Sequence, residues 1–381
     1  MIRNLLLVPE LPINLDEIKG GVHSASVNLI KGFSLLNIKV SVISFSREVH
    51  QIIRKNYSSN IELIYIPEGV FKLHTLNYLL NVPIQLKKQI KDFDPDIIHF
   101  EVGNTFMLSK ILGLCKKKYV LTIHGMSYEE GKIKKRRKEK LIWYFNALIQ
   151  DLMYPKNIIH LSEFSKNKYA QFSEFHTAII PNAVKDEYFN VPMKIRTENK
   201  LLYIGLIDIN KNLIFLLRQL RTLNAKHYNF TLIIAGDFIS SEYKSIIHEY
   251  IISNQLEKNV SFLGWITQQR LLSVLSESDI VVVSSMHESL PMVIAESMAA
   301  GKVVVSSNVG GIPEMIKDKE TGFLYSIKND KEFEAILSYL YNNHQSCSYI
   351  SNNARNFAYN NYHFKKVAEK TIQFYTEVIN D

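Results

Sequence analysis

The sequence predicts an α/β protein made of two facing, doubly wound domains. The main observation is that short, almost wholly apolar runs alternate with amphipathic stretches of helical length. Strands of a parallel sheet have this all-apolar character because helices cover both faces of the sheet. The second observation is the length, since 381 residues exceed what one domain usually holds.

The apolar runs supply the expected strands in chain order. In the first half they are Ile2–Val8, Val40–Phe45, Ile61–Ile66, Ile97–Phe100, Tyr119–Ile123, Ile158–Leu161 and Ala178–Ile180. In the second half they are Leu201–Ile204, Thr231–Ala235, Val260–Leu263, Ile280–Val283 and Val303–Val305. Amphipathic segments between them are Ser24–Leu36, Asn77–Lys91, Leu213–Leu223 and Leu271–Leu275. This repeated strand–helix order predicts Rossmann-like sheets.

A dozen strands rarely continue as one open layer, so the chain is expected to divide. The polar stretch Asn190–Asn199, which contains Pro192, is the predicted boundary. It separates an N-terminal domain, residues 1–190, from a C-terminal domain, residues 191–361. Apolar residues at mostly helical spacing predict a terminal helix over residues 362–381.

Positive charge is concentrated in the first half of the chain. Residues 1–190 hold 26 Lys and Arg against 18 Asp and Glu, whereas residues 191–381 hold 19 of each. The densest cluster is Lys132–Lys140. It suggests an anionic partner such as a membrane surface, although for a charge run taken alone a solvated loop and helix start is the favoured interpretation. Nucleic acid is not expected, because no aromatic residues interleave the basic run.

Two further features concern the compartment. Only two cysteines are present, which excludes a disulfide scaffold. No apolar run reaches the roughly 18–20 residues of a membrane span. The expected location is the cytoplasm, with peripheral association at the inner face of the membrane as a further expectation.

Ligands of open α/β sheets bind beyond the carboxyl ends of the strands, so the residues that follow each run are candidates for ligand binding. Gly20-Gly21 precedes the first helix, His124 follows Tyr119–Ile123, and Lys211 follows Leu201–Ile204. Two glycines before a helix suit an anion, and a lysine suits a phosphate. Taken singly, the two glycines are explained equally well by a loop turn, and the favoured interpretations of His124 and Lys211 are a structural histidine and an exposed lysine.

Two glutamates bracket the start of one predicted helix. Glu288 lies in the loop after Ile280–Val283, and Glu296 lies roughly 7 Å inside the helix that begins near Met292. A carboxylate accepts two hydrogen bonds side by side, which suits a vicinal diol, and the helix start favours an anion. Together with a second glycine pair, Gly310-Gly311, these strand ends predict a cleft between the two domains for a phosphate-bearing, hydroxyl-rich ligand.

The segment from Glu288 to Glu296 matches the E-x7-E motif of the family-four retaining glycosyltransferases, and the sequence resembles that family. The match continues through Glu314 and through Thr321–Leu324. The resemblance implies the two-domain GT-B fold, with residues 362–381 returning to the N-terminal domain, and a nucleotide-sugar donor, with UDP the commonest nucleotide.

The resemblance also implies residue roles. Glu288 and His124 would contact the donor sugar and carry catalysis. The remaining residues would bind the donor. Glu296 would bind the ribose diol, and Lys211 would neutralise the diphosphate. Gly20 and Gly21 would bring backbone N–H groups near the phosphates, and the backbone amides of Met292 and Val293 would hold sugar hydroxyls or phosphate.

Two positions depart from the family pattern. Leu206 stands where the family usually has a phosphate-binding arginine, and Pro291 stands where it often has glycine.

The expected reaction is transfer of a sugar to a glycan or lipid-linked acceptor in cell-surface polysaccharide synthesis, with retention and without a metal cofactor. A lysine and a helix start can stabilise a diphosphate leaving group without a cation. Asp94-Pro95-Asp96 is interpreted as a turn before a strand and not as a metal site. Two alternatives stay open: a nucleotide-sugar epimerase of the same architecture, and a non-enzymatic protein that binds membranes or polyanions.

Overall fold

The computed structural model describes residues 2–15, 20–68, 74–114, 116–124, 155–168, 176–193 and 199–381. The chain divides into two compact units, one made of Met1–Ala183 with Phe364–Asp381 and the other of Val184–His363. The division falls at 183/184, seven residues before the predicted boundary at 190. The reason is that Val184, Tyr188 and Val191 are buried in the core of the second unit.

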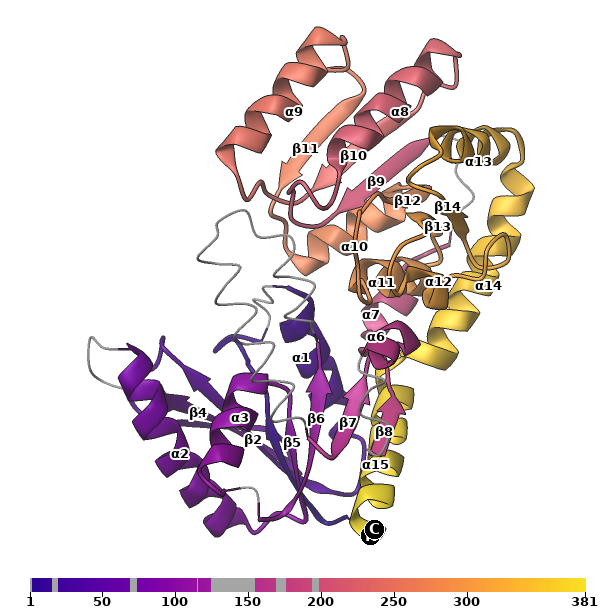
Figure 1. Cartoon of the computed structure of the whole chain (residues 1–381). Helices are drawn as coiled ribbons and strands as arrows, with labels where there is room; N and C mark the ends of the chain where they lie inside the picture. Colours follow the sequence, from indigo (N-terminus) through magenta and orange to yellow (C-terminus); the bar gives the residue numbers. More distant parts are fainter. Residues whose placement is uncertain are drawn as a thin grey trace. The chain divides into compact units, whose positions relative to one another are not determined.

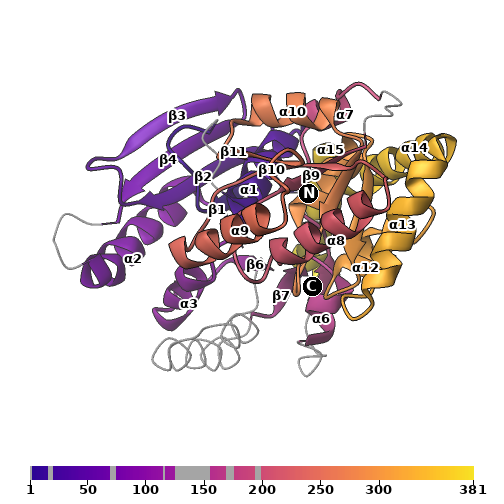
Figure 2. The same cartoon turned by 90° about the horizontal axis from the view of Figure 1, so that it is seen from above.

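The first unit contains one eight-stranded sheet in the order β3-β4-β2-β1-β5-β6-β7-β8. Its strands are β1 (Asn4–Val8), β2 (Lys39–Ser46), β3 (Ile53–Ser58), β4 (Ile61–Pro67), β5 (Ile97–Phe100), β6 (Lys118–Ile123), β7 (Asn157–His160) and β8 (His176–Ile179). All neighbours pair in parallel except β3, which runs antiparallel to β4 at the sheet edge (Figure 2). The sequence did not predict β3, because an edge strand half in water is polar, here IRKNYS.

Helices cover both faces of this sheet. One face packs under α1 (Gly21–Phe33) and α15 (Phe364–Asn380), and the other under α2 (His74–Phe93) and α3 (Gly103–Ile111). The short helix α6 (Glu163–Lys168) follows β7. The terminal helix α15 lies along α1 (Figure 1). At Gly32 of α1, an added Cβ would meet the Ala368 Cβ at 2.6 Å, so glycine allows this close approach. The predicted return of the terminal helix to the N-terminal domain is confirmed.

The second unit contains a six-stranded parallel sheet in the order β11-β10-β9-β12-β13-β14. Its strands are β9 (Lys200–Ile204), β10 (Thr231–Ala235), β11 (Val260–Gly264), β12 (Ile280–Val283), β13 (Val303–Ser307) and β14 (Phe323–Tyr325). The last strand, of three residues, was not predicted because so short a run carries no periodicity.

Helices again cover both faces of the second sheet. One face packs mainly under α8 (Leu213–Ala225), α9 (Ser241–Ser253) and α13 (Asp330–Asn342). The other packs under α7 (Asp186–Phe189), α10 (Gln268–Glu277), α11 (Met292–Ala299), α12 (Ile312–Met315) and α14 (His344–Tyr362). The predicted pair of doubly wound, Rossmann-like domains is confirmed. Among the described residues, no helix is both long and apolar enough to cross a bilayer.

Both sheets reverse their strand order at one point. In the second unit the chain adds β10 and β11 on one side of β9 and then crosses to β12 on the other side. In the first unit the equivalent neighbours are β1 and β5. At such a switch point the connections leave in opposite directions, which opens a crevice beyond the carboxyl ends of the strands. The candidate residues of each unit are therefore expected beside these two strand pairs.

Candidate active site

Lys211 and Glu288, which are 77 residues apart in sequence, meet at the switch point of the second unit. Lys211 follows β9 and Glu288 follows the neighbouring strand β12. The Lys211 ammonium forms an ion pair with Glu288 Oε1, and the Ser285 hydroxyl donates to the same oxygen at 2.7 Å. The two side chains are 30% and 13% exposed, respectively. The pair is therefore specifically placed but remains accessible to a ligand.

Hydrogen bonds join the loops that carry this pair. The Met286 amide donates to the Asn210 carbonyl at 2.8 Å, and the Asn210 side chain donates to the His287 carbonyl at 3.0 Å. The Ser284 hydroxyl donates to the Lys211 carbonyl at 2.7 Å. Because each loop satisfies the polar groups of the other, the position of Glu288 relative to Lys211 is fixed by backbone contacts as well as by charge.

The loop that follows β13 also contacts Glu288. The Gly311 amide donates to the Glu288 carbonyl at 3.1 Å. A Cβ on Gly310 would stand 1.8 Å from the same carbonyl oxygen, and Gly310 has a φ of 56°. Both the contact and the left-handed backbone require glycine. The second glycine pair thus holds the loop of Glu288, a role that the sequence signal of two adjacent glycines did not specify.

Helix α11 begins directly after this loop. Pro291 precedes Met292 and gives no side-chain cap, and no acidic residue lies in the first turn. The first amide groups of a helix have no partner within the helix, and the helix dipole makes this end electropositive. The amides of Met292 and Val293 are thus suited to an anion or a hydroxyl oxygen.

Glu296 lies one turn inside α11 beside the short helix α7. Its side chain accepts a hydrogen bond from Tyr188, and Lys185 is near enough to attract it. Burial is the larger effect and raises the pKa of Glu296 to about 7, against an ordinary value of 4.5. The carboxyl group therefore changes charge near neutral pH. Lys185 and Tyr188 were not predicted.

The remaining candidates belong to the first unit. Gly20, with a φ of 102°, precedes α1, and Gly21 is the first residue of that helix, whose first turn holds no acidic residue. His124 follows β6, and its Nε2 lies 2.5 Å from Oε2 of Glu101. Glu101 immediately follows β5 and was not predicted, although a polar residue at a strand end is the signal that marked the other candidates. The cluster Lys132–Lys140 lies outside the described residues.

The aspartates before β5 have structural partners. Asp96 Oδ2 accepts the amides of Arg3 and Asn4 at 2.7 and 2.9 Å, and Lys117 donates to Asp94 at 2.6 Å. Both carboxylates stand at the amino end of β5, opposite to the edge at which ligands bind. Among the described residues, no group of three or more His, Cys, Asp or Glu side chains is arranged to hold a metal ion.

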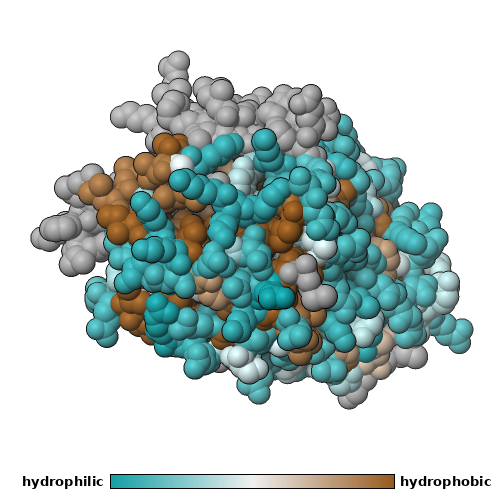
Figure 3. Space-filling model, turned by 90° about the horizontal axis from the view of Figure 1, so that it is seen from below, coloured by the Kyte–Doolittle hydropathy of each residue, from teal (hydrophilic) through white to brown (hydrophobic). Residues whose placement is uncertain are grey.

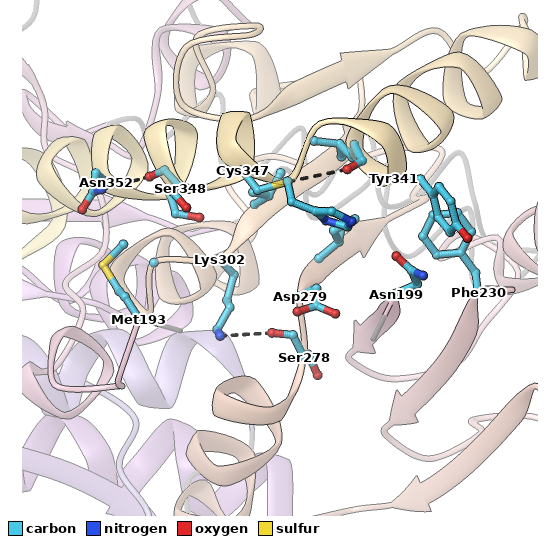
Figure 4. A pocket seen from close by; sticks show the side chains of 16 residues that line it. Met193, Asn199, Phe230, Ser278, Asp279, Lys302, Tyr341, Cys347, Ser348 and Asn352 are labelled. Atoms are coloured by element: carbon cyan, nitrogen blue, oxygen red, sulfur yellow. Dashed lines mark hydrogen bonds between the residues drawn. The ribbon is translucent and has the colours of Figure 1, made fainter. Parts of the chain in front are cut away.

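A cavity of about 330 Å³ lies at the amino ends of β12 and β13 (Figure 4). Ser278, Asp279 and Lys302 line it from these strand ends, and Cys347 and Asn352 line it from α14. The Lys302 ammonium donates to the Ser278 carbonyl at 3.0 Å. The cavity is at the opposite edge of the sheet from Lys211 and Glu288, so it is not part of the same site.

Known structures resemble nearly all of the chain, and known sequences resemble most of it. The crystal structure of Anabaena HepE in complex with UDP superimposes with a TM-score of 0.75 at 17% identity, over 98% of this chain and 100% of that chain. An uncharacterized glycosyltransferase of Methanocaldococcus jannaschii is 25% identical over 308 residues, 74% of this chain and 75% of the relative. The Escherichia coli UDP-Gal:alpha-D-GlcNAc-diphosphoundecaprenol alpha-1,3-galactosyltransferase is 22% identical over 313 residues, 78% and 79% of the two chains.

The two parallel, Rossmann-like sheets are the GT-B fold, which the similar solved structures share. Residues 184–357 match the family model described as glycosyl transferases group 1, and residues 19–188 match the model of Glycosyltransferase Family 4. The chain belongs to the family-four glycosyltransferases, which are retaining enzymes.

Proposed function

We propose that the chain transfers a sugar from a UDP-sugar to a glycan or lipid-linked acceptor in cell-surface polysaccharide synthesis, without a divalent metal ion. The observation that carries the proposal is the Lys211–Glu288 pair beside the uncapped start of α11. The family supplies the reaction type. The UDP in the HepE structure and the UDP-Gal donor of the E. coli relative support the choice of nucleotide.

The donor's nucleotide would bind in the second unit. Ionised Glu296 accepts both hydroxyls of the ribose, and Lys211 with the amides of Met292 and Val293 neutralises the diphosphate. In the first unit, the start of α1 at Gly20-Gly21 brings amides to the phosphates. His124 contacts the transferred sugar.

Breaking the sugar–phosphate bond leaves negative charge on the diphosphate and positive charge on the anomeric carbon. Lys211 stabilises the first by leaving Glu288 for the phosphate, an exchange that the partial exposure of the pair allows. The Glu288 carboxylate then loses its cation and keeps the Ser285 hydroxyl as its partner among the described residues. This carboxylate is free to accept sugar hydroxyls and to stabilise the developing positive charge. Each charge thus gains a partner without a metal ion.

The acceptor would be presented at an anionic membrane surface. The exposed face of α2 carries Leu80 and Ile84, 59% and 65% exposed, followed by the exposed Lys87, Lys88 and Lys91. Apolar side chains gather at the upper left of the face in Figure 3, the side of the molecule on which α2 lies. This combination is typical of a helix that rests in a lipid headgroup layer. The basic segment Lys132–Lys140 would add to the attraction.

Sedimentation with anionic and with neutral vesicles tests this surface. We expect binding to the anionic vesicles only, weakened by salt and by the triple change of Lys87, Lys88 and Lys91 to Gln. No binding to anionic vesicles at low salt would contradict it.

A thermal-shift screen with nucleoside diphosphates in EDTA, followed by product analysis, tests the reaction itself. We expect UDP to stabilise the protein and a UDP-sugar to lose its sugar only when an acceptor is added. Conversion of the nucleotide sugar to its epimer without acceptor would favour the epimerase. No shift with any nucleotide would leave only the non-enzymatic alternative.

A further inference from the structure

A cluster of buried polar side chains lies where β5 and β6 of the first unit end. His99, Glu101 and Tyr375 are 1%, 6% and 0% exposed, and Thr122 is also buried. Glu101 Oε1 lies 3.1 Å from His99 Nε2, and the Tyr375 hydroxyl lies 2.5 Å from His99 Nδ1. Tyr375 belongs to α15, so the terminal helix holds one end of the cluster. The other end is His124, bonded to Glu101.

The protonation of the cluster follows from burial and charge. Burial lowers the pKa of His99 to about 4, so this ring is neutral at pH 7. Burial alone would raise the pKa of Glu101, but the nearby imidazoles of His124 and His99 lower it to about 2. Burial raises the pKa of Tyr375 well above its ordinary value, so its hydroxyl keeps its proton and donates to His99 Nδ1. His99 Nε2–H then faces the Glu101 carboxylate and Thr122.

Glu101 uses its second oxygen to orient His124. The 2.5 Å contact joins Glu101 Oε2 to His124 Nε2, so Nε2 carries a proton. The His124 side chain is 9% exposed, and its Nδ1 is buried without a hydrogen-bond partner among the described residues. A buried polar atom without a partner is unusual and indicates a site for a ligand atom. His124 therefore offers Nδ1 to a ligand and Nε2 to Glu101.

We propose that Glu101 is the positioning residue of His124, and that it holds the ring so that Nδ1 faces the hydroxyl-rich donor sugar. This inference rests on the proposed function for the contact between His124 and the sugar. His99 and Thr122 contact the carboxylate in turn. A buried carboxylate–imidazole pair adds little stability by itself, because desolvation offsets the attraction, so its value lies in orientation.

Nitrogen NMR of the wild-type protein, with His124 assigned from a His124→Ala spectrum, tests the geometry without activity. The ring shifts of neutral imidazole distinguish a proton on Nε2 from one on Nδ1. We expect His124 to carry its proton on Nε2 in the wild type and to lose this preference in Glu101→Gln. A proton on Nδ1 in the wild type would overturn the assignment.

Kinetics separate positioning from a purely structural role. We expect Glu101→Gln to lower kcat about 10- to 100-fold, with the donor KM changed less than threefold, and to add nothing further in a His124→Ala background. Tyr375→Phe is the matched control, because it removes a buried hydrogen bond of the same cluster without touching His124, and its kcat should stay within threefold of wild type.

Equal losses of kcat in Glu101→Gln and Tyr375→Phe, or additive losses with His124→Ala, would overturn the inference. If Glu101→Gln does not fold, the wild-type NMR result decides. UDP binding by the wild type is measured in parallel. Absence of UDP binding contradicts the proposed function, whereas intact UDP binding with a misplaced proton contradicts only the role of Glu101.

Discussion

Two pairs of an acidic and a basic side chain, Glu288–Lys211 and Glu101–His124, differ in how they are held. Glu288 and Lys211 stand in loops of the second unit, and both remain partly exposed. Glu101 and His124 stand at strand ends of the first unit, at 3% and 9% side-chain exposure, and Glu101 has further partners behind it. Water and ligand can separate the first pair at small cost, whereas separation of the second leaves a buried charge.

This difference in exposure indicates which pair can change partners during a reaction. An accessible lysine can leave its glutamate for a phosphate, and the loops that support it need only hold the backbone. A buried pair cannot exchange partners, so its function is to keep one ring in one orientation. An acidic and a basic side chain can thus exchange partners in the second unit, whereas in the first unit the acidic side chain keeps the histidine ring in one orientation.

The largest expected effect comes from breaking the accessible pair. Lys211→Ala should lower kcat/KM about 100- to 1000-fold, because the diphosphate charge loses its cation. Lys226→Ala is the matched control, since Lys226 also pairs with a glutamate, Glu334, but at an exposed place on the same unit. Steady-state kinetics with a UDP-sugar measure both. Comparable losses in the two variants would show that Lys211 has no special role.

The next effect concerns the backbone that supports Glu288. Gly310→Ala should destabilise the protein by at least about 2 kcal/mol and reduce transfer, because the new Cβ collides with the Glu288 carbonyl. Gly113→Ala has a similar φ of 66° but meets nothing within 4 Å, so it should lose only about 1 kcal/mol and no activity. Urea unfolding and transfer assays distinguish the backbone strain, which both variants share, from the collision with the Glu288 carbonyl, which only Gly310→Ala has. Similar results for both would contradict the supporting role of Gly310.

A third effect depends on pH through Glu296. The pKa of Glu296 in the folded protein, about 7, exceeds its ordinary value of 4.5, so ionisation of Glu296 destabilises the folded state. This loss of stability begins at about pH 5 and reaches its full size above about pH 7. Glu296→Gln should therefore stabilise the protein at pH 8 by about 2 kcal/mol and hardly at all at pH 5. Urea unfolding at the two pH values measures this.

The same group should govern donor affinity in the opposite sense. Affinity for a UDP-sugar should rise as the pH increases through about 7, and Glu296→Gln should remove this dependence and weaken binding about 10- to 100-fold. A UDP-sugar is the appropriate probe, because free UDP has a terminal phosphate that itself titrates near about 6. A pH-independent affinity in the wild type would rule out the ribose role of Glu296.

The smallest effect should come from adding a cation. Leu206 is 45% exposed beyond β9, where the family usually has arginine. Leu206→Arg should strengthen UDP binding about three- to tenfold, because the new charge is partly screened by water. Calorimetry at two salt concentrations measures it, and unchanged affinity at low salt would place this position away from the diphosphate.

Local sequence patterns predicted the parts of the molecule that depend on local chemistry. All strands of the two sheets except β3 and β14 follow from apolar runs, and strand-end positions place Lys211 and Glu288 at the same edge of their sheet. The Tyr375–His99 contact joins residues 276 apart and depends on how α15 packs, which no local pattern contains. Tyr188 at Glu296 and Gly310 at Glu288 were missed for the same reason. The roles of Gly20, Gly21, Met292 and Val293 remain predictions.

Calorimetric titration of UDP in EDTA tests most directly the claim that the second unit holds a nucleoside diphosphate without a metal ion. The account predicts binding by the wild type, no gain from added Mg²⁺, and affinity at least tenfold weaker in Lys211→Ala and in Glu296→Gln. Binding that requires Mg²⁺, or that neither substitution weakens, would contradict it.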